Sequence, residues 1–483
     1  MISIFGLSIY SLMKLDILYI LENQTDFIST NQLQMLLGYS NMYLVKKNLR
    51  ELKEDIQEFY ENEEVLLVIS HHNGIKLIHE SDHLHPFIID FLSKDIAIEL
   101  LMLLLFTRDV STENFCETYY ISESSLRRKV KEINQHLAFY HLKITLSRKI
   151  RLVGPENKIR LVTFALLFFI YRTPEMMHEI PEYEDLQSLT HQLNDYLNVR
   201  DSAMQREILF FIILSYVLSI KRGAPYYPEP EHELYFDHID VLDKPDFLSD
   251  WSFYDWKLFI LSVHCADLHS TLLNNSQIVR LFQKNKLTRW QYLFTQNFRE
   301  LTQTESSLVK DSLISQFLTR TFFIMDNELF EHFHIIDEKK MRQSFPLFFN
   351  RFELFWQQFV QEFPESDFQY LKTVNFLFCL HLMPVESMFF RVHLHIYDLP
   401  DVLKTYIRLQ VFNRFGANFH LIFVDEAAKA DLILGTVSSY DIKVSTTPLY
   451  LCIKMNLTTS DYDQIEISLW QIIEQKGLAK TSK

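Results

Sequence analysis

The chain has little of the residue types that mark secreted, metal-binding or low-complexity proteins. Its 483 residues include only four cysteines, eight glycines and thirteen prolines. The cysteines are dispersed and form no CxxC pair, which favours a reducing, cytoplasmic compartment over a disulfide framework. They are Cys116, Cys265, Cys379 and Cys452. Scarce glycine and proline predict a helix-dominated chain with few flexible linkers.

Signatures of membrane passage, catalysis and metal binding are also missing. Residues 1–13 lack the basic leader and cleavage site of a signal peptide. The most hydrophobic later run, 208–220, is shorter than the ~20 residues that span a bilayer. Without a phosphate loop, dinucleotide fingerprint or nucleophile elbow, we expect no enzyme and no cofactor. His393 and His395 share a strand face but have no third ligand at a recognised spacing, so we expect no metal site.

The positive charge of this acidic chain is concentrated in one segment. The formal net charge is −15, yet residues 120–160 hold ten Lys or Arg against three Glu, a local surplus of seven positive charges. A basic patch on an acidic protein indicates an anionic partner that binds through that patch. With 48% hydrophobic residues, the chain can bury several cores, and its length suggests roughly three to five domains.

Residues 1–82 predict a winged helix-turn-helix domain. Ser29 is a good N-cap for a short helix over 31–37, and a longer helix ends near residue 56. Residues 65–79 read as a hairpin around Asn73-Gly74. The longer helix carries Val45, Leu49, Leu52 and Ile56 on its inner face and Tyr43, Lys46, Lys47 and Arg50 on its outer face. These outer residues are candidate DNA contacts, although nearby carboxylates nearly cancel their charge and leave a plain solvated surface as an equal alternative.

Residues 83–156 repeat the same order of elements. A helix over 96–106 precedes a short one capped by Ser111 or Thr112, and Ser122 caps a third helix that a basic hairpin follows. The third helix places Leu126, Val130, Ile133 and Leu137 on its inner face. Its outer face, with the hairpin tip, supplies the candidate DNA contacts Ser124, Arg127, Arg128, Lys131, Arg148 and Lys149. Two such units in tandem are a far more specific signal than one.

The rest of the chain predicts two helical domains and a small α/β domain. Residues 157–386 read as almost continuous helices, and 251–264 align with 368–381 as a weak repeat. We therefore place helical domains at 157–273 and 274–387. From 388 to 483, strands alternate with helices. The predicted class is a mainly α, multidomain protein.

This arrangement resembles the Mga/AtxA family of Gram-positive bacterial transcription regulators. The resemblance is carried best by Ile-Ser-Glu-Ser-Ser-Leu-Arg-Arg-Lys-Val-Lys-Glu-Ile-Asn, residues 121–134, and by Arg-Leu-Val-Gly at 151–154. It implies two regulatory domains controlled by the sugar phosphotransferase system, called PRDs, and a C-terminal domain similar to a phosphotransferase EIIB subunit. It further implies binding to double-stranded DNA, dimerisation, which we assign to the C-terminal domain, and regulation of large gene sets, often for virulence or carbohydrate use.

Two features depart from that family pattern. An EIIB enzyme of this type carries phosphate on a cysteine after its first strand, but residues 396–400 contain none, so that role is expected to be lost. Among the histidines, His264 and His381 have a repeated context and His191 a weaker one. These three are the candidates for phosphorylation by the phosphocarrier protein, with core or helix-end packing as the competing interpretation. A phosphotransferase-system relay or sensor acting through protein contacts, and a helical scaffold, remain as alternative functions.

Overall fold

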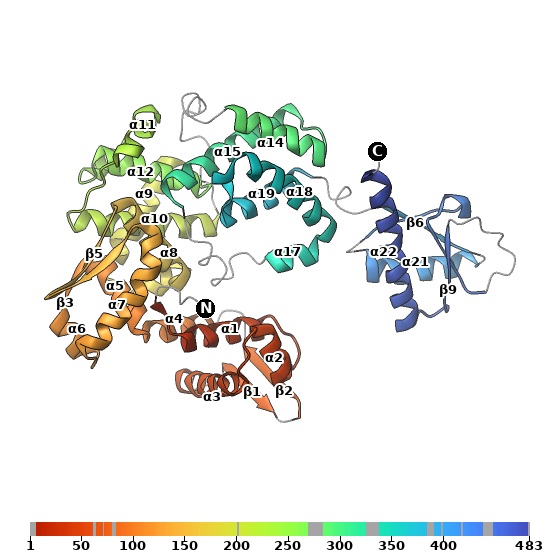
Figure 1. Ribbon diagram of the computed structural model, residues 1–483, viewed down its shortest axis with the longest axis horizontal. Helices are drawn as coiled ribbons and strands as arrows, with labels where there is room; N and C mark the ends of the chain where they lie inside the picture. The colour runs from red at the N-terminus through yellow and green to blue at the C-terminus, as the bar shows by residue number, and fades with distance from the viewer. Residues whose placement is uncertain are drawn as a thin grey trace. The chain divides into compact units, whose positions relative to one another are not determined.

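In the residues that it describes, the computed structural model is mainly helical with three small sheets (Figure 1), and the chain divides into two compact units. It describes residues 6–60, 64–70, 72–79, 84–199, 202–268, 284–324, 338–383, 391–397, 399–416, 419–437 and 448–481. One unit comprises Met1–Thr288 and Ser306–Ile335, and the other comprises Arg289–Glu305 and Ile336–Lys483.

The first helix-turn-helix segment has the predicted elements. They are α1 (Ile9–Glu22), α2 (Thr30–Leu37), α3 (Met42–Phe59), β1 (Val65–Ser70) and β2 (Gly74–His79), with the two strands antiparallel. Ser29 caps α2 through a complete capping box with Gln32, and Gly38 ends it in the left-handed region. The predicted inner face of α3 is buried from Val45 to Ile56. The sequence pattern predicts an amphipathic helix over 14–22, and α1 begins five residues earlier because Ser8 caps it.

The second segment contains the predicted elements and two more. The predicted ones are α5 (Ile96–Thr107), α6 (Thr112–Thr118), α7 (Glu123–Leu137), β4 (Lys143–Leu146) and β5 (Lys149–Val153). The sequence analysis missed α4 (Leu84–Ser93) and β3 (Asp109–Ser111). Strand β3 pairs with β5, so the sheet has the order β3-β5-β4. Of the two candidate caps for α6, Ser111 is the one used.

Helices fill the remainder of the first unit. They are α8 (Glu156–Tyr171), the 3₁₀ turn η3 (Pro174–Met177), α9 (Tyr183–Leu197), α10 (Ala203–Lys221), α11 (Pro230–His238), η4 (Asp246–Leu248), α12 (Phe253–Cys265) and most of α15 (Gln303–Phe322). By length and composition α10 could cross a membrane, contrary to the expectation from residues 208–220. Most of it, however, is buried in a shared core with residues of α9 and α12, which is the environment of a core helix.

The second unit contains the remaining helices and a parallel sheet. Its helical part has most of α14 (Lys284–Asn297), together with α17 (Glu338–Ser344), α18 (Pro346–Glu362), η5 (Pro364–Ser366) and α19 (Gln369–Leu382). The C-terminal part has β6 (Arg391–Ile396), α21 (Asp401–Phe415), β7 (His420–Phe423), η6 (Ala427–Lys429), β8 (Leu432–Gly435), β9 (Leu449–Cys452) and α22 (Thr459–Thr481). The strands are parallel in the order β7-β6-β8-β9, as expected for an α/β layer. The strand-like run at 449–453 predicts that Cys452 is buried, but this prediction is wrong: the thiol ends the edge strand β9 and is exposed.

Candidate nucleic-acid interface

Helix α7 presents a polar, cationic face on a buried apolar stripe. The Oγ atom of Ser122 caps the helix by accepting a hydrogen bond of 3.1 Å from the Ser125 amide. All four predicted inner residues, from Leu126 to Leu137, are buried. On the opposite face, Ser124, Arg127, Arg128, Lys131 and Gln135 are exposed. A recognition helix in a winged helix-turn-helix domain needs this division between a core-facing stripe and a solvent-facing one.

The cations of α7 differ in their ion pairs. Arg127 pairs with Glu123, one turn earlier, and Lys129 pairs with Glu132 at 2.9 Å. Within the described chain, neither Arg128 nor Lys131 has an acidic partner in ion-pair range. An exposed helical pair such as Arg127–Glu123 contributes only about 0.3–0.5 kcal/mol, so a phosphate could replace the carboxylate at little cost.

Side-chain hydrogen bonds connect the β4–β5 wing to α7 and α6. The side chain of Asn134, on α7, donates to the carbonyl of Ile144 at 2.9 Å and accepts from its amide at 2.6 Å. At the tip, Thr112 Oγ1 donates to the Ser147 carbonyl at 2.7 Å. The wing is therefore hydrogen-bonded to both α7 and α6. The sequence analysis missed Asn134, whose only signal was a polar residue next to the inner face.

Two of the cations on this wing share one carboxylate. Lys149 lies 3.0 Å from Asp109 Oδ1, and Arg151 lies 3.8 Å from Asp109 Oδ2. Arg148, at the exposed tip, has no such pair among the residues that the structure describes. Of the two predicted wing contacts, Arg148 is therefore presented more openly than Lys149.

The predicted contacts of the first segment also share one exposed face. Tyr43, Lys46, Lys47 and Arg50 are all exposed on α3. Lys47 is 3.6 Å from Glu51, and the Arg50 side chain donates to the Lys46 carbonyl at 3.4 Å. The β1–β2 tip carries Ser70, His72 and Asn73 instead of a cation, so this segment offers less positive charge than the second.

Tyr120 is an exposed aromatic residue in the turn between α6 and α7. It is 97% exposed and has φ +51°, in the left-handed region that suits glycine. In the first segment the corresponding helix end is Gly38, with φ +70°. Tyr120 lies two residues before Ser122, the cap of α7, and is therefore close in sequence to the cationic face. Strained positions of this kind often mark functional sites.

A buried ionic chain ties the second segment to the helical region. Arg108, which ends α5, donates to Glu156 of α8 at 2.6 Å. Glu156 also lies 3.4 Å from Arg160, whose Nη2 donates to Asp255 at 2.6 Å. Asp255 belongs to the capping box of α12. The end of α5 and the start of α12 are thus connected through four charged side chains.

The three candidate phosphorylation sites have different exposure. His191 on α9 and His381 near the end of α19 are exposed, whereas His264 at the end of α12 is only 6% exposed. The repeated sequence context of His264 and His381 therefore does not give them the same environment.

The histidines of the C-terminal sheet have local partners. His393 Nδ1 lies 3.2 Å from Asp431, and His395 Nδ1 lies 3.0 Å from the Val424 carbonyl. Over the described part of the chain, no three His, Cys, Asp or Glu side chains are grouped as a metal would require. Residues His83, His332 and His334, which also form histidine pairs in the sequence, lie outside the described residues.

In the comparisons with known proteins, one segment of the chain matches a protein-family model. No curated protein matches the chain. Residues 81–168, which contain α4 to most of α8, match the family model of the Mga helix-turn-helix domain. The segment with the exposed face of α7 and the basic wing is therefore similar to the helix-turn-helix domain of Mga regulators, and this points to a DNA-binding transcription regulator.

Proposed function

We propose that the chain is a Mga-like transcription regulator that binds duplex DNA mainly through its second helix-turn-helix segment. Helix α7 enters the major groove, where Ser124, Arg128 and Lys131 face bases or phosphates, and Arg127 exchanges Glu123 for DNA. Arg148 and Lys149 contact the backbone from the wing. The observation that carries this proposal is the cationic face of α7 within residues that match the Mga helix-turn-helix domain.

Tyr120 contributes a further contact beside the cationic face. Its ring is almost fully exposed at the start of α7, where the sugar-phosphate backbone or a base edge lies when the helix occupies a major groove. The first segment adds a smaller, less selective contribution through Tyr43, Lys46, Lys47 and Arg50.

Control by the sugar phosphotransferase system is the second part of the proposal. The phosphocarrier protein can reach His191 and His381 without any rearrangement, since both are exposed. His264 must first leave its buried position, because a phosphate of nearly −2 charge is costly to desolvate. The helical domains act here as PRD-like regulatory domains, and phosphorylation changes their packing and so the affinity for DNA.

Dimerisation through the EIIB-like C-terminal domain is the third part. One face of α21 packs on the sheet through Ile407, Val411 and Phe415. The other exposes an apolar stripe of Val402, Tyr406, Leu409 and Phe412, each 49–81% accessible. Such a stripe is self-complementary across a two-fold axis, and a dimer brings two DNA-binding segments to one operator. Sedimentation tests this part of the proposal, and the variant Leu409→Asp should be monomeric. Leu354→Asp, which changes a similarly exposed leucine on α18, is the control.

The alternative function is a phosphotransferase-system relay or sensor that acts through protein contacts. Salt-dependent binding to duplex DNA separates the two functions, because phosphate contacts release counterions and protein contacts do not. Fluorescence anisotropy with duplexes selected from a random library should show binding that weakens steeply with salt. The variant with Arg127, Arg128 and Lys131 changed to Ala should bind weakly. Changing Lys221, Arg342 and Lys429 to Ala alters net charge equally and should have little effect.

A further inference from the structure

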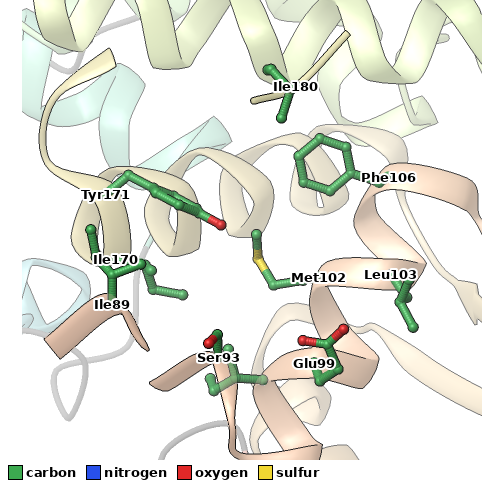
Figure 2. A pocket seen from close by; sticks show the side chains of 10 residues that line it. Ile89, Ser93, Glu99, Met102, Leu103, Phe106, Ile170, Tyr171 and Ile180 are labelled. Carbon is green, nitrogen blue, oxygen red and sulfur yellow. The ribbon is translucent and has the colours of Figure 1, made fainter. Parts of the chain in front are cut away.

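A pocket lies between the second helix-turn-helix segment and the helix that follows it (Figure 2). Its volume is about 280 Å³. One wall is a stripe of α5, formed by Met102, Leu103 and Phe106. The other walls come from α4, the end of α8 and Ile180. A cavity of ~150 Å³ accommodates one benzene ring, so this pocket has room for a ring with a short chain, about ten non-hydrogen atoms.

Apart from Glu99, helix α5 carries only apolar side chains as far as Phe106. Ala97, Leu101 and Leu104 face the core and are fully buried, whereas Met102, Leu103 and Phe106 are only partly buried because the pocket opens beside them. A helix that is apolar on all sides is normally covered on all sides. The pocket therefore leaves apolar surface that a ligand would remove from water.

The polar groups at the pocket favour a cationic head group. Figure 2 shows the Glu99 carboxylate and the Tyr171 hydroxyl pointing toward the space between the helices. Burial, followed by the negative charges of Glu99 and Glu179, raises the pKa of Tyr171. Among the residues that line the pocket, Glu99 alone carries a formal charge, so an amine suits the site better than a carboxylate.

Glu99 also connects the pocket to the turn before the recognition helix. Its Oε1 accepts a hydrogen bond from the hydroxyl of Tyr119, which ends α6. Burial and this bond raise the pKa of the Tyr119 hydroxyl. Tyr119 is adjacent to Tyr120, and Ser122 caps α7 two residues later. A cation bound to Glu99 weakens the hold of this carboxylate on Tyr119 and thus on the turn.

We propose that this pocket is an effector site for a small apolar amine, whose ammonium group pairs with Glu99 and whose apolar body lies between α5 and α8. Occupancy changes the turn at Tyr119 and Tyr120 and so alters affinity for DNA. The second statement rests on the proposed DNA-binding function, whereas the first does not.

Binding is tested first without DNA. Three probes with the same ring, 2-phenylethylamine, 2-phenylethanol and 3-phenylpropanoate, are titrated into the full chain labelled at isoleucine and methionine methyl groups. Signals of Ile89, Ile170, Ile180 and Met102 should shift, with affinity in the order amine, alcohol, carboxylate. Glu99→Gln keeps an acceptor for Tyr119 but removes the charge, and it should reduce the preference for amine over alcohol about tenfold.

Two Met→Trp variants provide the steric test. Met102→Trp fills the pocket and should abolish the methyl shifts, whereas Met204→Trp, at a residue 63% exposed on α10, should leave them unchanged. Equal affinity for the three probes, or binding that survives Met102→Trp, would overturn the site. If Met102→Trp fails to fold, the probe order and Glu99→Gln still decide the question.

The effector role is then tested on DNA. Saturating 2-phenylethylamine should change the affinity of the wild-type chain for a selected duplex and leave that of Glu99→Gln unchanged. Binding of the amine with no change in DNA affinity would overturn the effector role. If the wild-type chain binds no duplex at all, the proposed function fails, while the methyl titration still decides whether the pocket binds amines.

Discussion

Replacing Tyr120 by Gly should leave the fold as stable or make it more stable while weakening DNA binding. The left-handed conformation costs a non-glycine residue roughly 1–2 kcal/mol, and glycine recovers this cost. Glycine in turn costs about 0.5–1 kcal/mol through the entropy of the unfolded chain. Because the side chain is 97% exposed, its removal disturbs little packing. The net change in the free energy of unfolding should lie between zero and a gain of about 1.5 kcal/mol.

The effect on DNA should have the opposite sign. If the ring meets a base edge, its removal costs roughly 1–3 kcal/mol, which is at least a fivefold weaker complex. Urea unfolding and fluorescence anisotropy measure the two quantities on the same preparation. Tyr120→Asn is the matched control, since Asn tolerates the left-handed region and also removes the ring. A decrease of more than about 1 kcal/mol in the stability of Tyr120→Gly would refute the strain argument, and wild-type affinity in both variants would refute the proposed role of the ring.

Three further predictions concern the ionic chain, the dimer and phosphorylation. Asp255→Ala leaves Arg160, with a side chain only 2% exposed, with Glu156 at 3.4 Å as its remaining carboxylate partner, and urea unfolding should show a loss of about 3 kcal/mol; a loss under about 1 kcal/mol would mean that the site is hydrated. Leu409→Asp should halve the mass measured by sedimentation, and an undiminished dimer would exclude α21 as the interface. Incubation with phosphoenolpyruvate, enzyme I and the phosphocarrier protein should label His381 faster than buried His264, and the reverse order would contradict the exposure argument.

Helix periodicity and capping predicted most elements of the two helix-turn-helix segments because both signals are local. The inner residues of α7 and the caps Ser29, Ser111 and Ser122 were all correct. Strand β3 was missed because three residues carry no pattern, and its pairing with β5 depends on a tertiary contact. The same holds for the exposure of Cys452, which follows from the position of β9 at the sheet edge.

The sequence predicted the positive charge of the candidate interface but not which carboxylates form ion pairs with its cations. The outer-face cations followed from the helical period, whereas their partners did not. The sequence predicts Glu132 as the only acid near enough to pair with the cations at 127–131, but Glu123 pairs with Arg127 and Glu132 pairs with Lys129. The backbone conformation of Tyr120 has no sequence signal, since tyrosine is rarely left-handed. The difference between His264 and His381 was also hidden, because burial depends on helices distant in sequence.

The measurement that tests the central claim most directly compares two triple variants by anisotropy at several salt concentrations. One changes Arg127, Arg128 and Lys131 to Ala, and the other changes Lys46, Lys47 and Arg50 to Ala, so the net charge falls equally in both. The second-segment variant should bind duplex DNA far more weakly, with a salt slope lower by about one for each phosphate that it no longer neutralises. The first-segment variant should retain most of the affinity. Wild-type affinity in the second-segment variant, or equal weakening in both, would contradict the assignment of DNA binding to α7.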